Sequence, residues 1–443
     1  MTHGASGPQT IGIPTSGQLA WQRERNFAIF CHFGINTFFG KEWSDGTLPA
    51  SGFLPTALDV RQWAETARDA GASHIILTAK HHDGFCLWPT ATTDYSVASS
   101  PWRDGHGDVV GELAAACREI GLGLGLYLSP WDRHDPDWAG DPAAYDARYL
   151  QQLTELCTQY GPLVEVWFDG AGSETHPYDW DAIMRIVEEH QPDAMVFNMG
   201  RPTIRWVGNE DGLASDPCWY TVSETAKSIY TDAKDGLAGG GWYLPPECDV
   251  AIRRHWFWQP DDLHTLKRVE HLLAIWYRSV GLGANLLLNV PPDRRGLIDD
   301  NDRARLLAFA ETLRRRFAEP IAGEIAQDGT RVTVTFPADV TFDHVILREA
   351  IADGQRIGAH RVTDVASGRV LAEGVFTIGS QRVHAFPEVT SRELVIEIDD
   401  PAGLIDSVAA YRTGVTAIPA LEEQPAFMNE KIDSRSTEGD THD

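Results

Sequence analysis

The sequence predicts an α/β fold in which a (β/α)8 barrel of the TIM type is followed by a smaller antiparallel β-sandwich. Three observations predict it. The first 320 residues alternate short apolar segments with amphipathic ones. After Pro320 the sequence consists of short segments in which apolar and polar residues alternate with a period of two, as in exposed β-strands. The chain has 443 residues, which is more than a single hydrophobic core usually organises, so we expect two domains.

The alternating segments of the first part are typical of βα units. Buried strands are expected at 27–33, 74–78, 122–129, 163–170, 194–198 and 286–290, and helices at 59–71, 108–121, 143–160, 262–280 and 301–317. This pattern corresponds to roughly eight βα units over about 300 residues, the usual size of a (β/α)8 barrel. A doubly wound parallel sheet is the alternative, but no glycine-rich phosphate-binding fingerprint opens any of these helices.

Two of the predicted helices show clear start signals and an apolar stripe. Asp59 and Asp108 stand immediately before periodic apolar runs, where an aspartate side chain accepts hydrogen bonds from the first backbone N–H groups. The residues expected on the inner faces are Val60, Trp63, Ala64 and Ala67 in the first helix, and Val110, Leu113, Ala114 and Cys117 in the second.

Two regions depart from this rhythm. Residues 208–255 are rich in Gly, Trp, Pro and polar residues, and we interpret them as a long functional loop in which no long helix fits. After residue 320, strands are expected at 331–336, 343–349, 361–365, 375–379 and 393–398. The predicted domains are a flexible N-terminus (1–17), a catalytic barrel (18–320), a β-sandwich (321–418) and a mostly disordered tail (419–443).

The composition excludes several classes of partner. The formal net charge of −27 repels phosphate backbones and anionic lipids, so neither nucleic acid nor membrane is expected as a partner. No apolar run is long enough to span a bilayer, and the first residues lack the basic and apolar regions of a secretory signal. The six cysteines form no CxxC pair, and we expect reduced, buried thiols in a cytoplasmic protein. The oligomeric state stays open.

Polar and aromatic side chains cluster where four predicted strands end. In a (β/α)8 barrel these carboxyl ends form one rim, and catalytic side chains project from it. The clusters contain His32 after the first strand, His81, His82 and Asp83 after the second, Tyr127, Ser129 and Trp131 at the third, and Asp169 after the fourth. Because consecutive residues point in opposite directions, only one of the two adjacent histidines is expected to face the site directly.

Asp169 is the strongest catalytic candidate. It follows the apolar run that ends in Trp167 and Phe168, and burying a carboxylate there costs several kcal/mol unless partners or solvent satisfy it. A loop-capping aspartate before Gly170 is the alternative interpretation, which the three other polar strand ends make less attractive. Tryptophans crowd the same segments, and their apolar faces suit the C–H faces of a sugar ring.

At these residues the sequence resembles the α-L-fucosidases of glycoside hydrolase family 29. The resemblance is carried by FAIFCHFGINTFFGKEW, AKHHDGFCLWPTATTDYSV, GLGLYLSPWD, EVWFDGA and GANLLLNVPPD, and it covers about residues 18–415. It implies a retaining exo-α-L-fucosidase without a cofactor, acting on fucosylated oligosaccharides, with Asp169 as nucleophile. The substrate-binding residues that we expect are His32, Glu42, Trp43, His81, His82, Tyr127, Trp131 and Arg205.

The general acid/base is less well defined than the nucleophile. The string WVGNE resembles the acid/base segment of the subgroup that prefers branched α1-3/4-fucosylated glycans, so Glu210 is the first candidate. Glu247 is the alternative, Glu224 a weaker one, and either Arg201 or Arg205 could contact the sugar or orient Glu210. Asn285 and Asn289 are expected in structural turns around the last barrel strand. The C-terminal sandwich also resembles that subgroup, and without an aromatic stripe it is expected to play a structural role.

Two other functions remain to be weighed. A metal-dependent barrel hydrolase would use the HHD cluster at 81–83, but adjacent histidines diverge and no HxH or HExxH pattern is present, so no metal is expected. A catalytically inactive fucose-binding protein would keep the pocket without the carboxyl pair, whereas both candidate carboxyls are present here.

Overall fold

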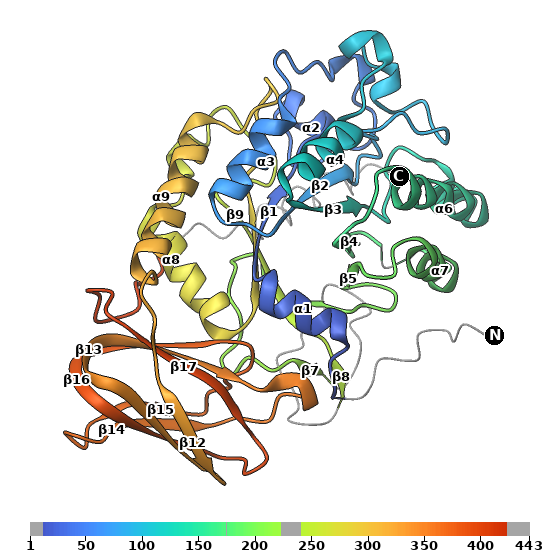
Figure 1. Cartoon of the computed structure of the whole chain (residues 1–443). Coiled ribbons are helices and arrows are strands. Elements are labelled where there is room, and N and C mark those ends of the chain that lie inside the picture. The colour runs from blue at the N-terminus through green and yellow to red at the C-terminus, as the bar shows by residue number, and fades with distance from the viewer. Residues whose placement is uncertain (1–11, 174, 223–240, 423–443) are drawn as a thin grey trace, which may run out of the picture.

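A computed structural model describes residues 12–173, 175–222 and 241–422. It consists of a barrel surrounded by helices, drawn from blue to yellow in Figure 1, and a β-rich domain, drawn in orange and red, packed against one side of the barrel. Apolar side chains of the barrel strands and their helices form one large buried cluster, and the β-rich domain has its own.

Eight strands form the barrel, and every neighbouring pair runs parallel. Their order is β5-β4-β3-β2-β1-β10-β9-β6, and an isolated bridge between Phe197 and Ile204 links the two edge regions. The strands are β1 (Phe27–Cys31), β2 (His74–Lys80), β3 (Gly123–Leu128), β4 (Glu165–Trp167), β5 (Met195–Phe197), β6 (Arg205–Trp206), β9 (Pro246–Ala251) and β10 (Asn285–Asn289). The predicted fold class is therefore confirmed.

Helices cover the outside of this barrel. They are α1 (Ser16–Glu24), α2 (Ile35–Phe39), α3 (Val60–Asp69), α4 (Val109–Ile120), α5 (Asp137–Gly140), α6 (Pro142–Gln159), α7 (Trp180–His190), α8 (Val269–Arg278) and α9 (Asp300–Arg316). The side chains of Asp59 and Asp108 accept hydrogen bonds from the backbone N–H groups of Gln62 and Gly111, which caps α3 and α4 as predicted. The predicted inner faces of both helices are buried.

The prediction of one long loop at 208–255 is wrong in part, because β9 lies inside it. This strand has the sequence PECDVA, in which a glutamate and an aspartate interrupt the apolar pattern that normally marks a barrel strand. All six of its residues are nonetheless buried, so the carboxyls lie inside the protein. A short pair, β7 (Thr221–Val222) and β8 (Trp242–Tyr243), also falls in this range, and residues 223–240 lie outside the described part of the chain.

The C-terminal domain is antiparallel. Its strands are β11 (Ile321–Ala322), β12 (Glu324–Asp328), β13 (Arg331–Glu349), β14 (His360–Asp364), β15 (Val370–Gly374), β16 (Arg382–Ile398) and β17 (Ile405–Tyr411). Two predicted strands, 331–336 and 343–349, are parts of β13, which is broken by shifts in its register with β16. The strand predicted at 375–379 is wrong, because the chain forms β15 just before it, and β17 was not predicted.

Hydrogen bonds join the two domains. The Tyr220 hydroxyl donates to the carbonyl of Gly283 in the barrel and lies 2.9 Å from the hydroxyl of Ser380 in the C-terminal domain. The predicted domain boundaries themselves remain predictions. Residues 1–11 and 423–443 of the two predicted terminal segments lie outside the described residues.

The described residues also bear on the membrane and cysteine predictions. In this part of the chain no helix is long and apolar enough to cross a membrane. All six cysteines are buried, and none of them forms a disulfide.

Candidate active site

The predicted site residues follow strands that are neighbours in the barrel. His32 comes directly after β1, His81 and His82 after β2, Ser129 after β3, and Asp169 two residues after β4. These four strands are adjacent in the order β4-β3-β2-β1 and run parallel, so their carboxyl ends meet at one rim. The structure therefore brings together the residues that the sequence placed at separate strand ends.

Asp169 has hydrogen-bond donors at both carboxylate oxygens. The Tyr127 hydroxyl donates to Oδ2 over 3.1 Å, and the backbone N–H of Ala171 donates to Oδ1 over 2.9 Å. His82 Nε2 lies 3.5 Å from Oδ2, and the Asp169 side chain is 20% exposed. Burial, and then the charge of Asp169, raise the pKa of the Tyr127 hydroxyl well above its usual value, so this donor stays protonated. The carboxylate is thus oriented and stabilised while its side chain remains partly exposed.

Ser129 orients the imidazole of His82. The Ser129 hydroxyl donates to the carbonyl of Trp131 over 2.6 Å, so its oxygen accepts the proton of His82 Nδ1, which lies 2.7 Å away. This arrangement turns Nε2 of His82 toward Asp169. The ring also lies against Trp43 and Trp131, with centroid separations of 5.2 Å in both cases.

His32 is oriented by Asn289 at the end of β10. The amide oxygen of Asn289 accepts from the backbone N–H of His32 and lies 3.0 Å from its Nδ1. Because an amide oxygen can only accept, Nδ1 carries a proton. The amide group of Asn289 donates in turn to the carbonyl of Trp256. Asn289 is therefore a positioning residue in the site, and the prediction that it belongs to a structural turn is wrong.

The two adjacent histidines do not diverge. The ring centroids of His81 and His82 are 4.2 Å apart, and His81 stacks on Tyr127 at 5.6 Å. His81 also contacts the rings of His32 and Phe257. The chain after β2 turns at once, with a hydrogen bond from the N–H of Gly84 to the carbonyl of His81, so the alternation of an extended strand no longer applies. Both imidazoles belong to the same cluster.

Glu42 joins the site to the segment after β9. Its two carboxylate oxygens accept from the backbone N–H groups of Trp256 and Phe257 at 2.9 and 3.3 Å. Trp256 in turn contacts the His32 ring at 5.0 Å, and its indole N–H donates to Glu210 over 3.3 Å. Trp256 therefore connects Glu42, His32 and Glu210, the three candidates that lie on different segments of the chain.

Glu210 has a second acid nearby that the sequence interpretation missed. Asp249 in β9 is buried and accepts a hydrogen bond of 2.6 Å from the indole N–H of Trp206. Burial, followed by the charge of Glu210, raises the pKa of Asp249 well above its usual value. Glu210 itself is half-buried.

The alternative acid, Glu247, lies lower in the barrel. In the register of β9 with β10 it is opposite Asn285, whereas the rim residue Asn289 is opposite Ala251. Its carboxyl is 1% exposed and accepts a hydrogen bond of 3.1 Å from the indole N–H of Trp167. It therefore lies inside the barrel beneath the rim, and Glu224 lies outside the described residues.

The two arginine candidates occupy different surroundings. Arg201 is exposed and forms ion pairs with Asp181 and Glu188 of α7. Arg205 is buried at 3% exposure, and its guanidinium donates to the carbonyls of Trp206 and Trp219. Of the two, Arg205 is the one inside the barrel wall.

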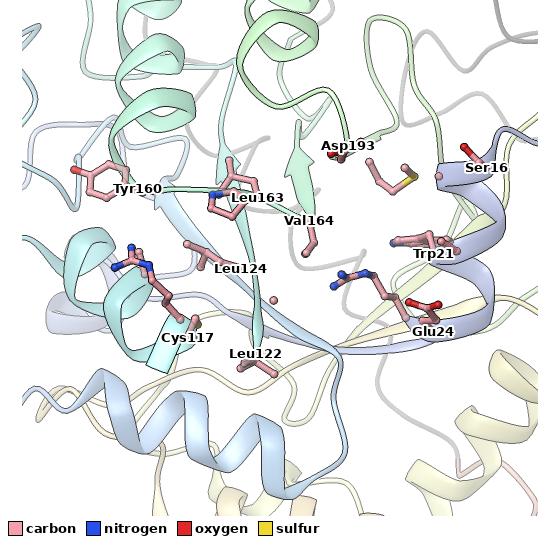
Figure 2. A pocket seen from close by; sticks show the side chains of 18 residues that line it. Ser16, Trp21, Glu24, Cys117, Leu122, Leu124, Tyr160, Leu163, Val164 and Asp193 are labelled. Atoms are coloured by element: carbon pink, nitrogen blue, oxygen red, sulfur yellow. The ribbon is translucent and has the colours of Figure 1, made fainter. Parts of the chain in front are cut away.

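A separate cavity of about 550 Å³ opens at the other end of the barrel (Figure 2). It is lined by Trp21 and Arg25 near β1, by Gly123 at the start of β3, and by Val164 and Met195 at the starts of β4 and β5. None of the predicted site residues lines it. Among the described residues no group of three or more His, Cys, Asp or Glu side chains is arranged to hold a metal ion.

Sequence and structure comparisons agree on the class of this protein. Residues 41–316 match the family model described as alpha-L-fucosidase. The chain is 39% identical to alpha-L-fucosidase 1 of Arabidopsis thaliana, with 88% of this chain and 85% of the relative covered. It is 26% identical to the tissue alpha-L-fucosidase of Mus musculus, with 66% and 69% covered.

Solved structures show the same architecture. A glycoside hydrolase 29 family member from an unknown rumen bacterium is 34% identical, with a TM-score of 0.85 over 95% of this chain and 80% of that one. A Ruminococcus gnavus GH29 fucosidase in complex with fucose is 30% identical, with a TM-score of 0.81 over 93% of this chain and 97% of that one. The barrel and its rim of acids, histidines and aromatic rings thus define a glycoside hydrolase. The chain belongs to the α-L-fucosidase family, glycoside hydrolase family 29, and is an α-L-fucosidase.

Proposed function

We propose that this α-L-fucosidase is a retaining exo-enzyme that removes terminal α1-3/4-linked fucose from oligosaccharides, with Asp169 as nucleophile and Glu210 as acid/base. One observation carries the proposal. The Asp169 carboxylate lies two residues after β4, is held by the Tyr127 hydroxyl and the Ala171 N–H, and belongs to a side chain that is 20% exposed.

In the first step, a carboxylate oxygen of Asp169 attacks the anomeric carbon of fucose. Glu210 donates a proton to the glycosidic oxygen, the carbon–oxygen bond to the leaving group breaks, and a fucosyl ester of Asp169 forms. The hydrogen bonds from Tyr127 and Ala171 hold the carboxylate in a fixed orientation before attack, which saves the entropy of aligning it.

In the second step, Glu210 acts as a base. It takes a proton from water, the water oxygen attacks the anomeric carbon from the face that the leaving group left, and Asp169 departs as a carboxylate. A retaining pair of this kind works with the two carboxyls about 5–5.5 Å apart. The contact of Glu210 with Trp256, whose ring lies against His32, supports its place opposite Asp169.

We assign recognition of the fucose hydroxyls to the histidines and Glu42, and packing of its apolar face to the tryptophans. His32 and His82 have one ring nitrogen fixed by Asn289 and Ser129, so the other nitrogen has a defined direction. A hydrogen bond from a sugar hydroxyl to an ionised carboxylate such as that of Glu42 is stronger than one between neutral groups. The candidates are His32, Glu42, Trp43, His81, His82, Tyr127, Trp131 and Arg205.

Two measurements test the mechanism. NMR of the first product should show α-fucose before mutarotation, because two displacements restore the configuration, and β-fucose as first product would refute retention. Glu210→Ala should reduce turnover of substrates with poor leaving groups far more than that of an activated aryl fucoside, and added azide should give fucosyl azide. Equal losses for both substrates would argue against Glu210. Glu247→Ala in the same assay provides the comparison with the alternative acid.

The linkage preference rests on the resemblance of the WVGNE segment and of the C-terminal domain to the α1-3/4-specific subgroup. A screen of α1-2, α1-3, α1-4 and α1-6 fucosyl oligosaccharides tests it. Release restricted to branched α1-3/4 structures is expected, and efficient release from α1-2 or α1-6 substrates would overturn this part of the proposal.

We also propose a cytoplasmic location. It is supported by the six buried cysteine thiols, none of which is paired. Fractionation of the source cells, followed by activity measurements, tests it, and activity confined to a secreted fraction would contradict it.

A further inference from the structure

The segment that follows β9 carries a residue that joins three parts of the site. Residues 252–257 form neither helix nor strand. Within them, the backbone N–H of Trp256 donates to Glu42 over 2.9 Å, and its indole N–H donates to Glu210 over 3.3 Å. The centroid of the same ring lies 5.0 Å from that of His32. Since no regular element fixes this segment, other contacts must hold Trp256 in place.

Lys267 holds the first part of the segment. Its ammonium group donates to the carbonyl of Ala251 over 2.6 Å and to that of Arg253 over 3.1 Å. Its backbone N–H donates to the carbonyl of Ile252, which lies between them, over 2.9 Å. Lys267 is 7% exposed, and the three residues whose carbonyls it binds are buried as well. Buried carbonyls need partners, and hydrogen bonds from an ammonium group are stronger than those from neutral donors. One residue thus satisfies three successive carbonyls.

Arg253 ties the same segment to aspartates outside it. Its Nε donates to Asp302 Oδ1, and its Nη1 donates to Asp262 Oδ1, each over 2.8 Å. Its Nη2 lies 3.4 Å from Asp299 Oδ1. The guanidinium is buried, so these carboxylates compensate a charge that would otherwise be costly. Asp302 belongs to α9, which covers the outside of the barrel (Figure 1), so Arg253 connects the segment to a rigid element.

The residues held in this way are close to Trp256 in the chain. Arg253 precedes it by three residues, and the backbone N–H of Arg254 donates to the Thr265 hydroxyl oxygen over 3.0 Å. The amide group of Asn289 donates to the carbonyl of Trp256 over 2.8 Å. Hydrogen bonds therefore hold both ends of this stretch of the chain. A displacement of about 1 Å in a group that orients a reacting residue can lower a rate about 100-fold.

We infer that Lys267 and Arg253 are positioning residues, which hold residues 251–257 against the barrel and, through the indole N–H of Trp256, fix the direction of the Glu210 carboxyl. The inference rests on the proposed role of Glu210 as acid/base. The partners described for the two cationic groups are backbone carbonyls and aspartates, so both residues act through Trp256 and not on the sugar itself.

The test compares two aryl fucosides that differ in their leaving group. Phenol leaves poorly and needs a proton from the acid, whereas 2-chloro-4-nitrophenol leaves as an anion without one. Lys267→Met keeps the length of the side chain but has no donor. It should lower kcat/KM about 10–100-fold on phenyl fucoside and less than about threefold on 2-chloro-4-nitrophenyl fucoside, because only the first reaction depends on a well-placed acid. A purely structural role would not change this dependence on the leaving group.

Two further variants sharpen the test. Arg253→Lys keeps a cation beside the aspartates and loses only the forked geometry, so it should show the same selective loss, about tenfold on phenyl fucoside. Trp256→Phe removes the indole N–H and keeps a ring beside His32, so it should reproduce the selectivity of Lys267→Met. The double variant Lys267→Met, Trp256→Phe should be at most about twofold worse than the more damaging single change, because both changes act on one hydrogen bond.

Equal losses on the two fucosides, or no loss on either, in folded Lys267→Met overturn the inference. Arg253→Lys decides it by the same criterion if Lys267→Met does not fold. Fully additive effects of Lys267→Met and Trp256→Phe overturn the route through Trp256. Asp343→Ala, in the C-terminal domain, controls for a general loss of stability and should change kcat/KM on both fucosides by less than about twofold.

Glu210→Ala, measured with the same two fucosides, separates this inference from the proposed function. If that variant loses both activities equally, Glu210 is not the acid/base and the proposed function fails. If it loses the phenyl fucoside selectively while Lys267→Met and Arg253→Lys behave as wild type, only the positioning inference fails.

Discussion

Four buried carboxyl groups of the barrel and Asp343 of the C-terminal domain respond to burial in opposite ways. In the barrel, burial is the largest influence on Asp83, Glu165, Glu247 and Asp249, and the pKa of each is raised. In the C-terminal domain, burial opposes ionisation of Asp343, but N–H and O–H donors from His344, Thr413 and Gly414 outweigh it and lower its pKa.

The difference reflects what each carboxyl does. Asp343 closes the loop after β17 by accepting from Thr413 and Gly414, so nearly all of its hydrogen-bonding capacity serves the fold. Glu247 and Asp249 of the barrel instead accept hydrogen bonds from the indole N–H groups of Trp167 and Trp206. A buried acid with many backbone donors is thus a structural clamp, whereas one with few is available for chemistry or positioning.

The largest expected effect is a loss of activity when Asp169, at the rim of the barrel, is replaced. Asp169→Asn should lower kcat on an aryl fucoside on the order of 10³–10⁵-fold, because the amide cannot form the fucosyl ester. Its thermal unfolding should stay close to that of the wild type, since the amide oxygen can still accept from Tyr127 or Ala171. Turnover within tenfold of wild type would remove Asp169 from the mechanism.

The matching change in the C-terminal domain should affect stability and leave activity alone. Asp343→Ala removes the acceptor of two backbone N–H groups and of the Thr413 hydroxyl, and we expect the free energy of unfolding to fall by about 2–4 kcal/mol. Denaturant unfolding and kcat measure the two effects. A large loss of kcat in a folded Asp343→Ala protein would mean that this domain contributes to the site.

Asp83 tests the effect of a buried barrel carboxyl on the pH dependence of stability. Burial raises its pKa to about 7, and the hydrogen bond from the Phe85 N–H only partly offsets this. The folded state therefore binds a proton that the unfolded chain, with a pKa of about 3.9, has released. The stabilisation is complete below about pH 4 and is lost as the pH rises through 7.

Asp83→Asn should accordingly flatten the pH dependence of stability. Between pH 5 and pH 8 the wild type should lose about 2–3 kcal/mol more than the variant, as measured by urea unfolding at both pH values. Identical losses in the two proteins would show that Asp83 is ionised throughout this range.

The smallest effect is expected at Arg201. Its ion pairs with Asp181 and Glu188 lie on the exposed surface of α7, and exposed pairs contribute little to stability. Arg201→Ala should change kcat/KM by less than about twofold and the free energy of unfolding by less than about 1 kcal/mol. A tenfold rise in KM would place Arg201 in substrate binding after all.

Features that depend on neighbouring residues in the sequence were predicted correctly, whereas features that depend on distant residues were missed. Asp59 and Asp108 cap their helices as predicted, because a cap depends on the next three residues. Strand β9 was missed, because Glu247 and Asp249 look like loop residues until the barrel surrounds them with Trp167 and Trp206. The role of Asn289 was also missed, because its partner His32 is 257 residues away in the chain.

By itself, the sequence determined the alternation of strands and helices in the barrel, the change to short β-strands after Pro320, and the group of chemically active residues at the strand ends. These follow from periodicity and residue type, which any short segment carries alone. Only the tertiary structure decided that both adjacent histidines lie in one cluster, that Glu247 lies beneath the rim, and which buried acids have a raised pKa. Those properties depend on desolvation and on partners from distant strands, and neither exists until the chain is folded.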